Sequence, residues 1–470
     1  MNKILSLTLI GASALCLASC SGEEDDIFEA TAAERLNAAS ELYSARLTAQ
    51  PNGWAMQYYP TYDNEAPNGK GYLLLTRFNK DFTVNVSGYD WPVWRYERPA
   101  GADADASSEW ICHYTNEYRE SSSFWQVITD NGPVLSFNSY NTNMHYFSDP
   151  DFRETGTGFG GDYEFIVVDA PEDASYMMLK GKKRGTYNLL TPIEEGVDYP
   201  VYMADVKGFH NAIFPEKELV SNLVHFGDSI YRMDGSHDGV PNIYPYDGDP
   251  ITNESFNPFL ITKRGNDYYL RFRDAIERED MEGELRELRY DSIQGKFIGM
   301  DNADFQITGY YPSRFLKEKV TNGSKPQVTP SSSISDKINE YFTGLSDDFT
   351  ALKDSRNRTY RFIGISFAFD GKTEQYVWNI IFRVPGSSGN STASFVFDVT
   401  NDDNTVTMNY KEPLDETSAN VGNTIPRIYE LMKELSQSYN VVPVISNFNL
   451  SQLKLVSQSN PDTWFVFNIQ

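Results

Sequence analysis

Residues 71–86 read Gly71-Tyr-Leu-Leu-Leu-Thr-Arg-Phe78, then Asn79-Lys-Asp81, then Phe82-Thr-Val-Asn-Val86. Two runs of strand length, rich in apolar, aromatic and β-branched residues, flank a short polar turn, and this pattern predicts a β-hairpin. Further pairs of this kind occur at residues 125–129 with 134–137, 259–263 with 268–272, and 453–457 with 464–469. Aromatic residues, which favour strands, make up 14% of the chain, so the sequence predicts a fold built mainly from antiparallel sheets.

A few segments show helical patterns instead. Thr31 and Glu34 match a capping box at the start of a helix, and Pro51-Asn52-Gly53 follows its end. Later helices are expected over residues 202–213, 336–343 and 425–435. A chain of 470 residues is long enough for two or three domains with sizeable cores.

Residues 321–335 separate two regions of different size. This stretch is rich in Ser, Thr, Pro and Gly, and we predict that it is a linker. The expected fold class is α+β and β-rich. Residues 30–320 are expected to form a large antiparallel-sheet domain with few helices, and residues 336–470 a smaller α+β domain.

The start of the chain predicts a membrane anchor. Lys3 precedes a short apolar run, and Ala18 and Ser19 stand directly before Cys20. The run is shorter than the roughly 20 residues that a membrane span needs, so residues 1–19 are interpreted as a lipoprotein signal peptide. Acyl chains on Cys20 would then hold the protein on a membrane. The alternative is that Cys20 follows an ordinary signal peptide by chance and carries no lipid. Residues 20–29 are expected to form an acidic tether.

Charge and cysteine content narrow the possible partners. The net charge of −26 argues against nucleic acid as a partner, because phosphate binding needs clustered Lys and Arg. It also argues against adhesion to an anionic lipid surface other than through the anchor. Cys112 is the one cysteine that remains after removal of the signal peptide and lipidation of Cys20, so no intramolecular disulfide is expected.

No recognisable catalytic motif is present in the sequence. Neither His-Glu-x-x-His nor Gly-x-Ser-x-Gly occurs. Gly156-x-Gly158-x-x-Gly161 matches a dinucleotide fingerprint, but it precedes a predicted strand rather than a helix. Cys112 and His113 are neighbours in a predicted strand and would point to opposite faces, which disfavours a catalytic dyad. We therefore predict no catalytic residue and no cofactor.

A partial calcium-loop pattern occurs at Asp234-x-Ser236-x-Asp238-Gly239. The position that should supply a bidentate Glu holds Pro245, so the pattern is incomplete. Asp247 and Asp249 would be needed to complete an irregular site. We favour a turn with solvated carboxylates and predict no metal.

Aromatic residues are densest between residues 89 and 125, and four of them are the candidate ligand contacts: Trp91, Trp94, Tyr96 and Trp110. Flat rings on a loop can stack on the faces of sugars or grip peptide side chains. Trp91, Trp94 and Tyr96 do not follow a strict two-residue alternation, which favours a loop over a buried strand. The alternative is that these rings fill the core of a large sheet.

Several motifs together resemble a surface-lipoprotein family of Bacteroidota known as domain of unknown function 4302. The resemblance begins with the signal-peptide cysteine and the acidic tether, and extends to about residue 310. It is carried by Ala33-Glu34-Arg35-Leu36, Pro51-Asn52-Gly53-Trp54, Gly132-Pro133-Val134-Leu135-Ser136-Phe137 with Tyr140-Asn141 and His145, Gly160-Gly161-Asp162-Tyr163-Glu164-Phe165, and Lys180-Gly181-Lys182-Lys183.

The resemblance implies a setting rather than an activity. Such lipoproteins are similar to accessory components of starch-utilisation-type importers, in which a transporter of the outer membrane works with a ligand-capturing lipoprotein lid. The acidic residues Glu23 to Asp26 resemble a signal that sends lipoproteins to the outer face of the cell. A merely flexible spacer is the alternative.

These observations lead to a functional expectation. We expect a non-enzymatic lipoprotein of the outer membrane, anchored through Cys20 and facing the cell exterior, that captures a glycan or peptide for a TonB-dependent importer. A hydrolase of the same uptake system, either a glycosidase or a peptidase, is one alternative. A purely structural subunit of the importer is the other.

Overall fold

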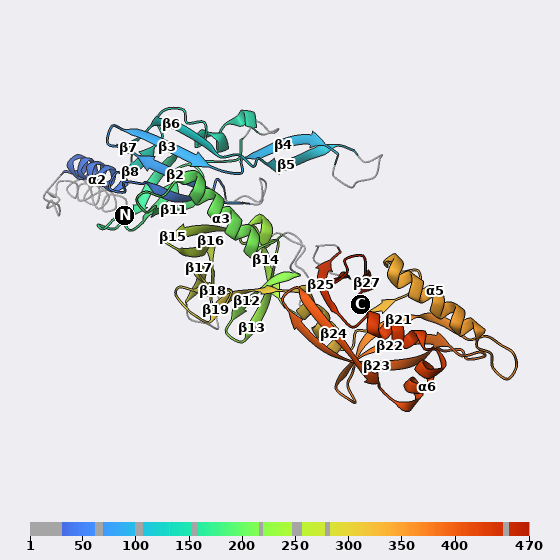
Figure 1. The fold of residues 1–470 in the computed structure, drawn as a ribbon. Helices are drawn as coiled ribbons and strands as arrows, with labels where there is room; N and C mark the ends of the chain where they lie inside the picture. Colours follow the sequence, from blue (N-terminus) through green and yellow to red (C-terminus); the bar gives the residue numbers. More distant parts are fainter. Residues whose placement is uncertain are drawn as a thin grey trace, which may run out of the picture.

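The computed structural model describes residues 31–61, 69–98, 107–130, 132–152, 158–215, 220–246, 256–277, 283–444 and 451–469. The signal peptide, Cys20 and the acidic tether lie outside these residues. Three units follow one another in an elongated arrangement: an N-terminal sheet, a middle sheet and a closed barrel (Figure 1). The described part of the chain contains six α-helices, so the fold is α+β and β-rich, as the sequence predicts.

The N-terminal sheet has nine strands and begins with the hairpins that the sequence predicts. The hairpin over residues 71–86 is confirmed, because β2 pairs with β3 and the Phe82 amide donates to the Asn79 carbonyl across the turn. The order across the sheet is β6 (Arg119–Phe124), β3 (Thr83–Gly88), β2 (Tyr72–Phe78), β1 (Trp54–Tyr58), β11 (Tyr187–Pro192), β10 (Met177–Gly181), β9 (Glu164–Asp169), β8 (Pro133–Ser136) and β7 (Gln126–Thr129).

Both faces of this sheet are covered over its central strands. One face buries Trp54, Met56 and Leu74 in a core next to α2 (Ala32–Leu47), whose predicted Thr31–Glu34 capping box is confirmed. The opposite face buries Ala55, Leu73 and Leu75 against α3 (Tyr199–Ile213). Residues therefore alternate between two apolar environments along β1 and β2.

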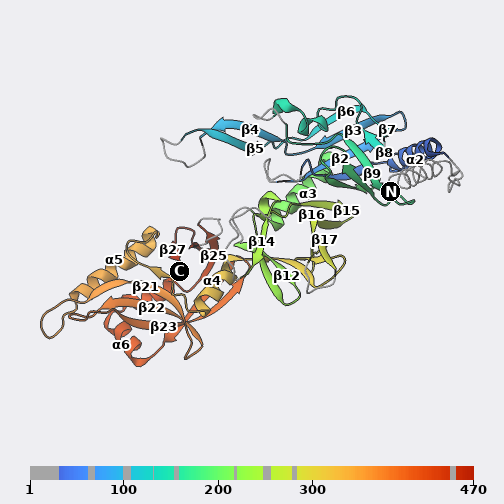
Figure 2. The same ribbon diagram turned by 180° about the vertical axis from the view of Figure 1, so that it is seen from behind.

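Helix α3 lies between the N-terminal sheet and the middle sheet (Figure 2). Tyr202, Met203 and Val206 of α3 share one core with Leu75 and with Phe259 of the middle sheet, so the two sheets form one packed unit. The middle sheet has the order β14 (Asn242–Pro245), β13 (Ser229–Asp234), β12 (Ser221–Phe226), β19 (Phe305–Tyr310), β18 (Lys296–Gly299), β17 (Glu284–Asp291), β16 (Asp267–Glu277) and β15 (Phe259–Arg264).

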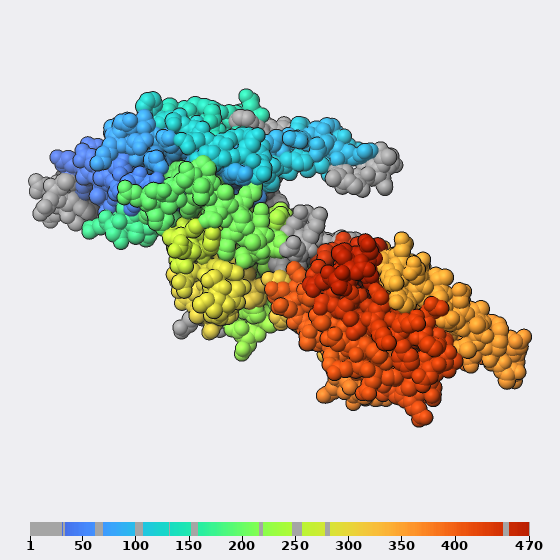
Figure 3. All heavy atoms as spheres, in the orientation of Figure 1, coloured from blue at the N-terminus to red at the C-terminus, as the bar shows by residue number. Residues whose placement is uncertain are grey.

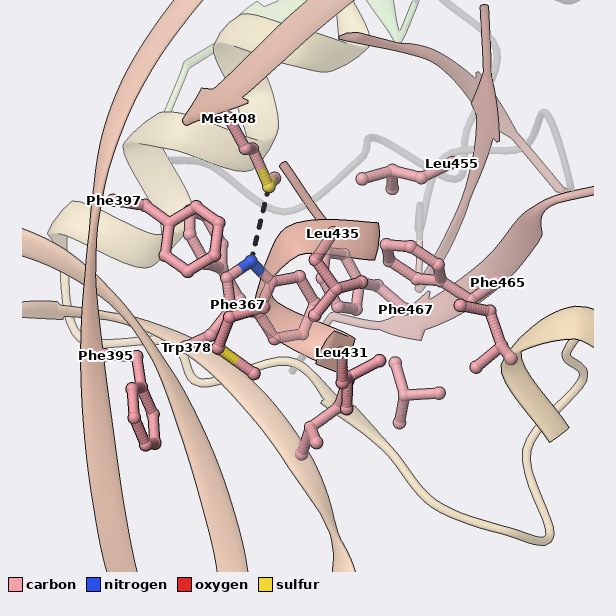
Figure 4. Close-up of a cluster of buried hydrophobic side chains, with 14 of the residues drawn as sticks. Phe367, Trp378, Phe395, Phe397, Met408, Leu431, Leu435, Leu455, Phe465 and Phe467 are labelled. Atoms are coloured by element: carbon pink, nitrogen blue, oxygen red, sulfur yellow. Dashed lines mark hydrogen bonds between the residues drawn. The ribbon is translucent and has the colours of Figure 1, made fainter. Parts of the chain in front are cut away.

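The third unit is a closed barrel with a separate aromatic core. Trp378 is fully buried, and its indole N–H donates to the Met408 sulfur at 3.4 Å (Figure 4). The barrel strands are β20 (Gln327–Val328), β21 (Arg361–Asp370), β22 (Gln375–Arg383), β23 (Ser391–Asp402), β24 (Thr405–Pro413), β25 (Ser438–Pro443), β26 (Gln452–Ser457) and β27 (Trp464–Asn468). Its helices are α4 (Pro312–Thr321), α5 (Asp336–Ala351), α6 (Glu416–Thr424) and α7 (Arg427–Glu434).

The predicted linker over residues 321–335 is part of the barrel. Gln327–Val328 form β20, which pairs with β21 and β27 and closes the barrel. At the end of the stretch, the Ser335 side chain accepts from the Ile338 amide and caps α5. The prediction of a linker is therefore wrong for this segment, because a two-residue strand between turns is too short to show a hydrophobic period.

Candidate functional site

The aromatic segment after residue 90 forms a projecting arm rather than a loop. Strands β4 (Pro92–Glu97) and β5 (Glu109–Tyr114) make a two-stranded antiparallel ribbon separate from the other sheets. The arm extends away from the N-terminal sheet (Figures 1 and 3). The prediction of a loop is wrong. Trp91 lies before the first residue of β4, and the two aromatic residues inside the strand, Trp94 and Tyr96, follow the two-residue period of a strand.

One face of the arm is aromatic. The register places Pro92 opposite Tyr114, Trp94 opposite Cys112, and Tyr96 opposite Trp110. Directly opposed residues point to the same side of an antiparallel ribbon, so these side chains share a face. We call Trp94, Tyr96, Trp110 and Tyr114 the aromatic face of the arm.

Two rings of the aromatic face are open to solvent. The Tyr96 side chain is 63% exposed and the Trp110 side chain 46% exposed. Their ring centroids lie 5.5 Å apart with the planes tilted by 53°. The structure therefore brings together two of the four predicted contact residues as an exposed pair.

The other two predicted contacts lie closer to the body of the protein. Trp91 is only 1% exposed, and its ring lies 5.6 Å from that of Tyr146 and 5.8 Å from that of Phe147. The Trp91 ring therefore fills a core, as the alternative predicts for these rings, and it is not open to a ligand in this structure. Trp94 is half-buried and packs against the same core.

Trp91 also fixes the base of the arm. Its backbone N–H donates to the Thr115 hydroxyl at 3.1 Å, and its carbonyl accepts from the Thr115 N–H at 3.0 Å. These bonds join the two strands of the arm where they leave the N-terminal sheet. The buried ring and the paired backbone together hold the arm in place.

A cavity of about 390 Å³ lies at the base of the arm, and we call it the arm pocket. Segments far apart in the sequence meet there: the start of β2, the turn before β4, the end of β5, helix α3 and the turn before β14. Its lining includes Lys70, Tyr72, Tyr89, Tyr114, Lys207 and Asp238. Tyr114 belongs to the aromatic face, so the arm pocket and that face are continuous.

Lys207 of α3 joins the helix to the base of the arm. Its ammonium lies 2.7 Å from a carboxylate oxygen of Asp90 and 2.8 Å from the side-chain oxygen of Asn116. It also lies 4.5 Å from the ring centroid of Tyr89. Asp90 has a φ of 60°, a left-handed conformation that Asp tolerates better than most residues. Lys207 is thus fully engaged by protein groups.

Lys70 is the second lysine that lines the arm pocket. Its ammonium lies 3.9 Å from the centroid of the Tyr114 ring, a cation–π distance. Removal from water lowers the pKa of Lys70, while the charges of Asp238 and Asp90 act in the opposite direction. Lys70 thus contributes a positive group to a partly aromatic wall.

The histidines beside the arm pocket have structural partners. Burial lowers the pKa of His210 to about 4, so its ring is neutral at pH 7. The His210 Nε2 lies 2.9 Å from the His237 carbonyl oxygen, which accepts a hydrogen bond from it. The His237 Nδ1 in turn lies 2.8 Å from the Phe214 carbonyl. These bonds hold the turn η3 (Ser236–Asp238) against α3.

Two further sequence predictions concern the same region. Cys112 and His113 are successive residues of β5 and therefore point to opposite faces; the His113 Nε2 lies 2.6 Å from a carboxylate oxygen of Glu97. Asp234 accepts a hydrogen bond from the Tyr244 hydroxyl, whereas Asp247 and Asp249 lie outside the described residues. Among the residues that the structure describes, no group of three or more His, Cys, Asp or Glu side chains is arranged so that it could hold a metal ion.

Sequence reasoning missed the arm pocket itself. Lys70, Tyr89 and Lys207 carry no motif, and they meet only because β2, the turn before β4 and α3 converge. The one feature of the sequence that pointed to this region was the density of aromatic residues in the arm.

None of the described helices combines the length and apolar character that crossing a membrane requires.

Comparison with known proteins covers the first half of the chain. A family model described as "Domain of unknown function (DUF4302)" matches residues 24–282. This range includes the N-terminal sheet, the arm, α3 and every residue of the arm pocket, but not the barrel. No curated protein matches the chain.

Proposed function

The chain belongs to the DUF4302 family, and on that premise we propose that it is a lipoprotein of the outer membrane that captures a glycan or peptide for a TonB-dependent importer. The proposal has two parts, a ligand site on the arm and an anchor at Cys20. The exposed pair of Tyr96 and Trp110 is the observation that carries the first part.

The aromatic face has the properties of a binding surface. Large rings that build a core are buried, as Trp91 and Trp125 are, whereas Tyr96 and Trp110 belong to no hydrophobic core among the described residues. Flat exposed rings stack on the faces of sugars and on apolar side chains. The arm pocket at the base adds the concavity and the few polar groups that ligand sites have.

The test is binding of a panel of oligosaccharides and peptides, measured by isothermal titration calorimetry. The double variant Tyr96→Ala/Trp110→Ala is expected to weaken binding by tenfold or more, because each lost ring contact contributes on the order of 1 kcal/mol. Phe124→Ala is the matched control, since Phe124 is also an exposed aromatic residue, but lies on β6. Equal affinity in the wild type and the double variant would rule out this site.

Two other outcomes of the same panel would support the alternatives. Cleavage of a panel member by the purified protein would favour a hydrolase of the uptake system. Co-purification with an importer or its lid lipoprotein, without any ligand binding, would favour a structural subunit.

The anchor is tested separately. The small residues before Cys20 and the acidic residues after it support lipidation and display on the cell exterior. Mass spectrometry of the protein from membranes is expected to show acyl chains on Cys20, and Cys20→Ala to release the protein from the membrane fraction. Protection of the wild-type protein from protease added to intact cells would contradict outward display.

A further inference from the structure

Lys70 is a cation of the arm pocket that forms no ion pair with the residues that the structure describes. Among the described residues it forms neither an ion pair nor a hydrogen bond, and its one polar contact is the Tyr114 ring. Lys207, in the same pocket, binds both Asp90 and Asn116. An ammonium has three donors, and leaving them unused in a partly buried site is unfavourable.

A second polar group in the arm pocket also lacks a partner. The Tyr72 hydroxyl is buried and forms no hydrogen bond with the described residues. Burial raises the pKa of Tyr72, and interaction with the Tyr114 hydroxyl raises it further, although the two hydroxyls do not meet hydrogen-bond geometry. Lys70 and Tyr72 therefore present unsatisfied donors to the same cavity, which suits an acceptor group on a ligand.

The carboxylates of the arm pocket leave this positive charge available. Asp90 is engaged by Lys207 at 2.7 Å. Asp238 attracts Lys70 through space but forms no ion pair with it in the described structure. Because the protein carries a net charge of −26, a partly buried ammonium that has no ion-pair partner among the described residues points to a role.

We propose that the arm pocket binds the carboxylate of an acidic sugar at Lys70, and that the neighbouring units of the oligosaccharide lie along the aromatic face of the arm. This inference rests on the proposed capture function and names the ligand class. From Tyr114 to Trp110 the strand runs four residues, or roughly 14 Å, so an oligosaccharide rather than a single sugar contacts both ends.

Sugar fits this arrangement better than peptide. One common mode of peptide binding adds the peptide backbone to a strand edge, whereas the unsatisfied donors among the described residues here are side-chain groups in a cavity beside the ribbon. Side chains of Asn211 and Asp238 line the same cavity and can bond hydroxyl groups. The rings of Tyr96 and Trp110 offer flat surfaces for the remaining units.

The experiment compares uronic-acid tetrasaccharides with their carboxyl-reduced, neutral counterparts by isothermal titration calorimetry. The panel contains galacturonate, glucuronate and mannuronate forms. The wild type is expected to bind at least one acidic form tenfold or more tightly than its reduced form, with affinity falling as salt rises. Lys70→Met should abolish this preference, and Lys70→Arg should keep part of it.

Lys80→Met is the matched control. Lys80 is exposed in the turn between β2 and β3, so its loss changes the net charge equally without touching the arm pocket. The wild-type comparison of acidic and reduced forms needs no variant and remains decisive even where Lys70→Met misfolds. Thermal unfolding of each variant verifies that it is folded.

Each other outcome overturns a defined part of the account. Tight binding of neutral forms that depends on Trp110 but shows no preference for acid refutes the acidic-sugar assignment and leaves the capture function standing. Lys70-dependent binding of a peptide carboxylate, in place of sugar, also refutes the assignment. Binding of no member of either panel by the wild type refutes both proposals.

Discussion

Trp91 lies at the base of the arm and Trp110 lies within it, and these two tryptophans have different environments. Trp91 lies at the base, where the N-terminal core surrounds its ring, and it is 1% exposed. Trp110 lies on β5, five positions along the arm from Thr115, the residue that pairs with Trp91, and it is 46% exposed. Distance from the sheet, rather than residue type, separates a structural role from a candidate binding role.

Truncation of Trp91 is expected to destabilise the protein strongly, and truncation of Trp110 hardly at all. Trp91→Ala should lower the free energy of unfolding by about 3–5 kcal/mol, because it leaves a large cavity in the core. Trp110→Ala should change it by less than about 0.5 kcal/mol. Urea denaturation followed by circular dichroism measures both, and a stable Trp91→Ala variant would contradict the anchoring role.

His210 predicts a pH dependence of stability. Its pKa is about 4 in the folded protein and 6.5 ordinarily, so between these values the unfolded chain binds the extra proton. The contribution of His210 is therefore complete above pH 6.5 and is lost as the pH falls toward 4, by at most about 3 kcal/mol.

The measurement for His210 is urea unfolding at pH 7 and pH 4.5. The His210→Gln variant retains a donor for the His237 carbonyl but does not titrate. The wild type is expected to lose more stability than this variant on acidification. Equal losses in the two proteins would show that another group is responsible.

At the scale of elements, the arm is a ribbon of two strands that receives its stability from its base. A two-stranded ribbon is marginal in water unless it packs against something. Here the Trp91 ring, the backbone bonds to Thr115, and the ion pair between Asp90 and Lys207 supply that support. Helix α3 therefore positions the arm as well as joining the two sheets.

Loss of the ion pair at the base is expected to loosen the arm. Lys207→Met removes the contacts to Asp90 and Asn116, and should cost about 1 kcal/mol, since both partners of the ion pair are partly exposed. Hydrogen–deuterium exchange should quicken in β4 and β5 while β26 and β27 stay protected. Unchanged exchange in the arm would show that Trp91 alone holds it.

Local sequence patterns predicted most elements but not the site. The hairpins and the Thr31 capping box depend on neighbouring residues, and they form as expected. Strand β20 was missed because two residues are too few to show a period, and the prediction of a loop at β4 was wrong because it counted Trp91, which precedes the strand, with Trp94 and Tyr96. The arm pocket depends on contacts between segments far apart in sequence, which a single sequence does not reveal.

At the scale of the whole molecule, two sheets behave as one body and the barrel as another. Helix α3 shares a core with both sheets, whereas the barrel is built around its own cluster, which includes Trp378 and Phe465 (Figure 4). Leu223 and Tyr310 of the middle sheet join that cluster and link the two bodies. The arm pocket belongs entirely to the first body.

Damage to the barrel is therefore expected to leave the two sheets folded. Trp378→Ala should destabilise the barrel by about 3–5 kcal/mol. Differential scanning calorimetry should show one transition move to lower temperature while a second, from the sheets, stays in place. A single transition that shifts as a whole would show that the two bodies unfold together.

The most direct test of the account is calorimetric titration of the oligosaccharide and peptide panels into the wild type and the Tyr96→Ala/Trp110→Ala variant. We expect at least one panel member to bind the wild type and to lose tenfold or more of its affinity in the variant. Equal affinity for every ligand in the two proteins, or no binding to the wild type, would contradict it.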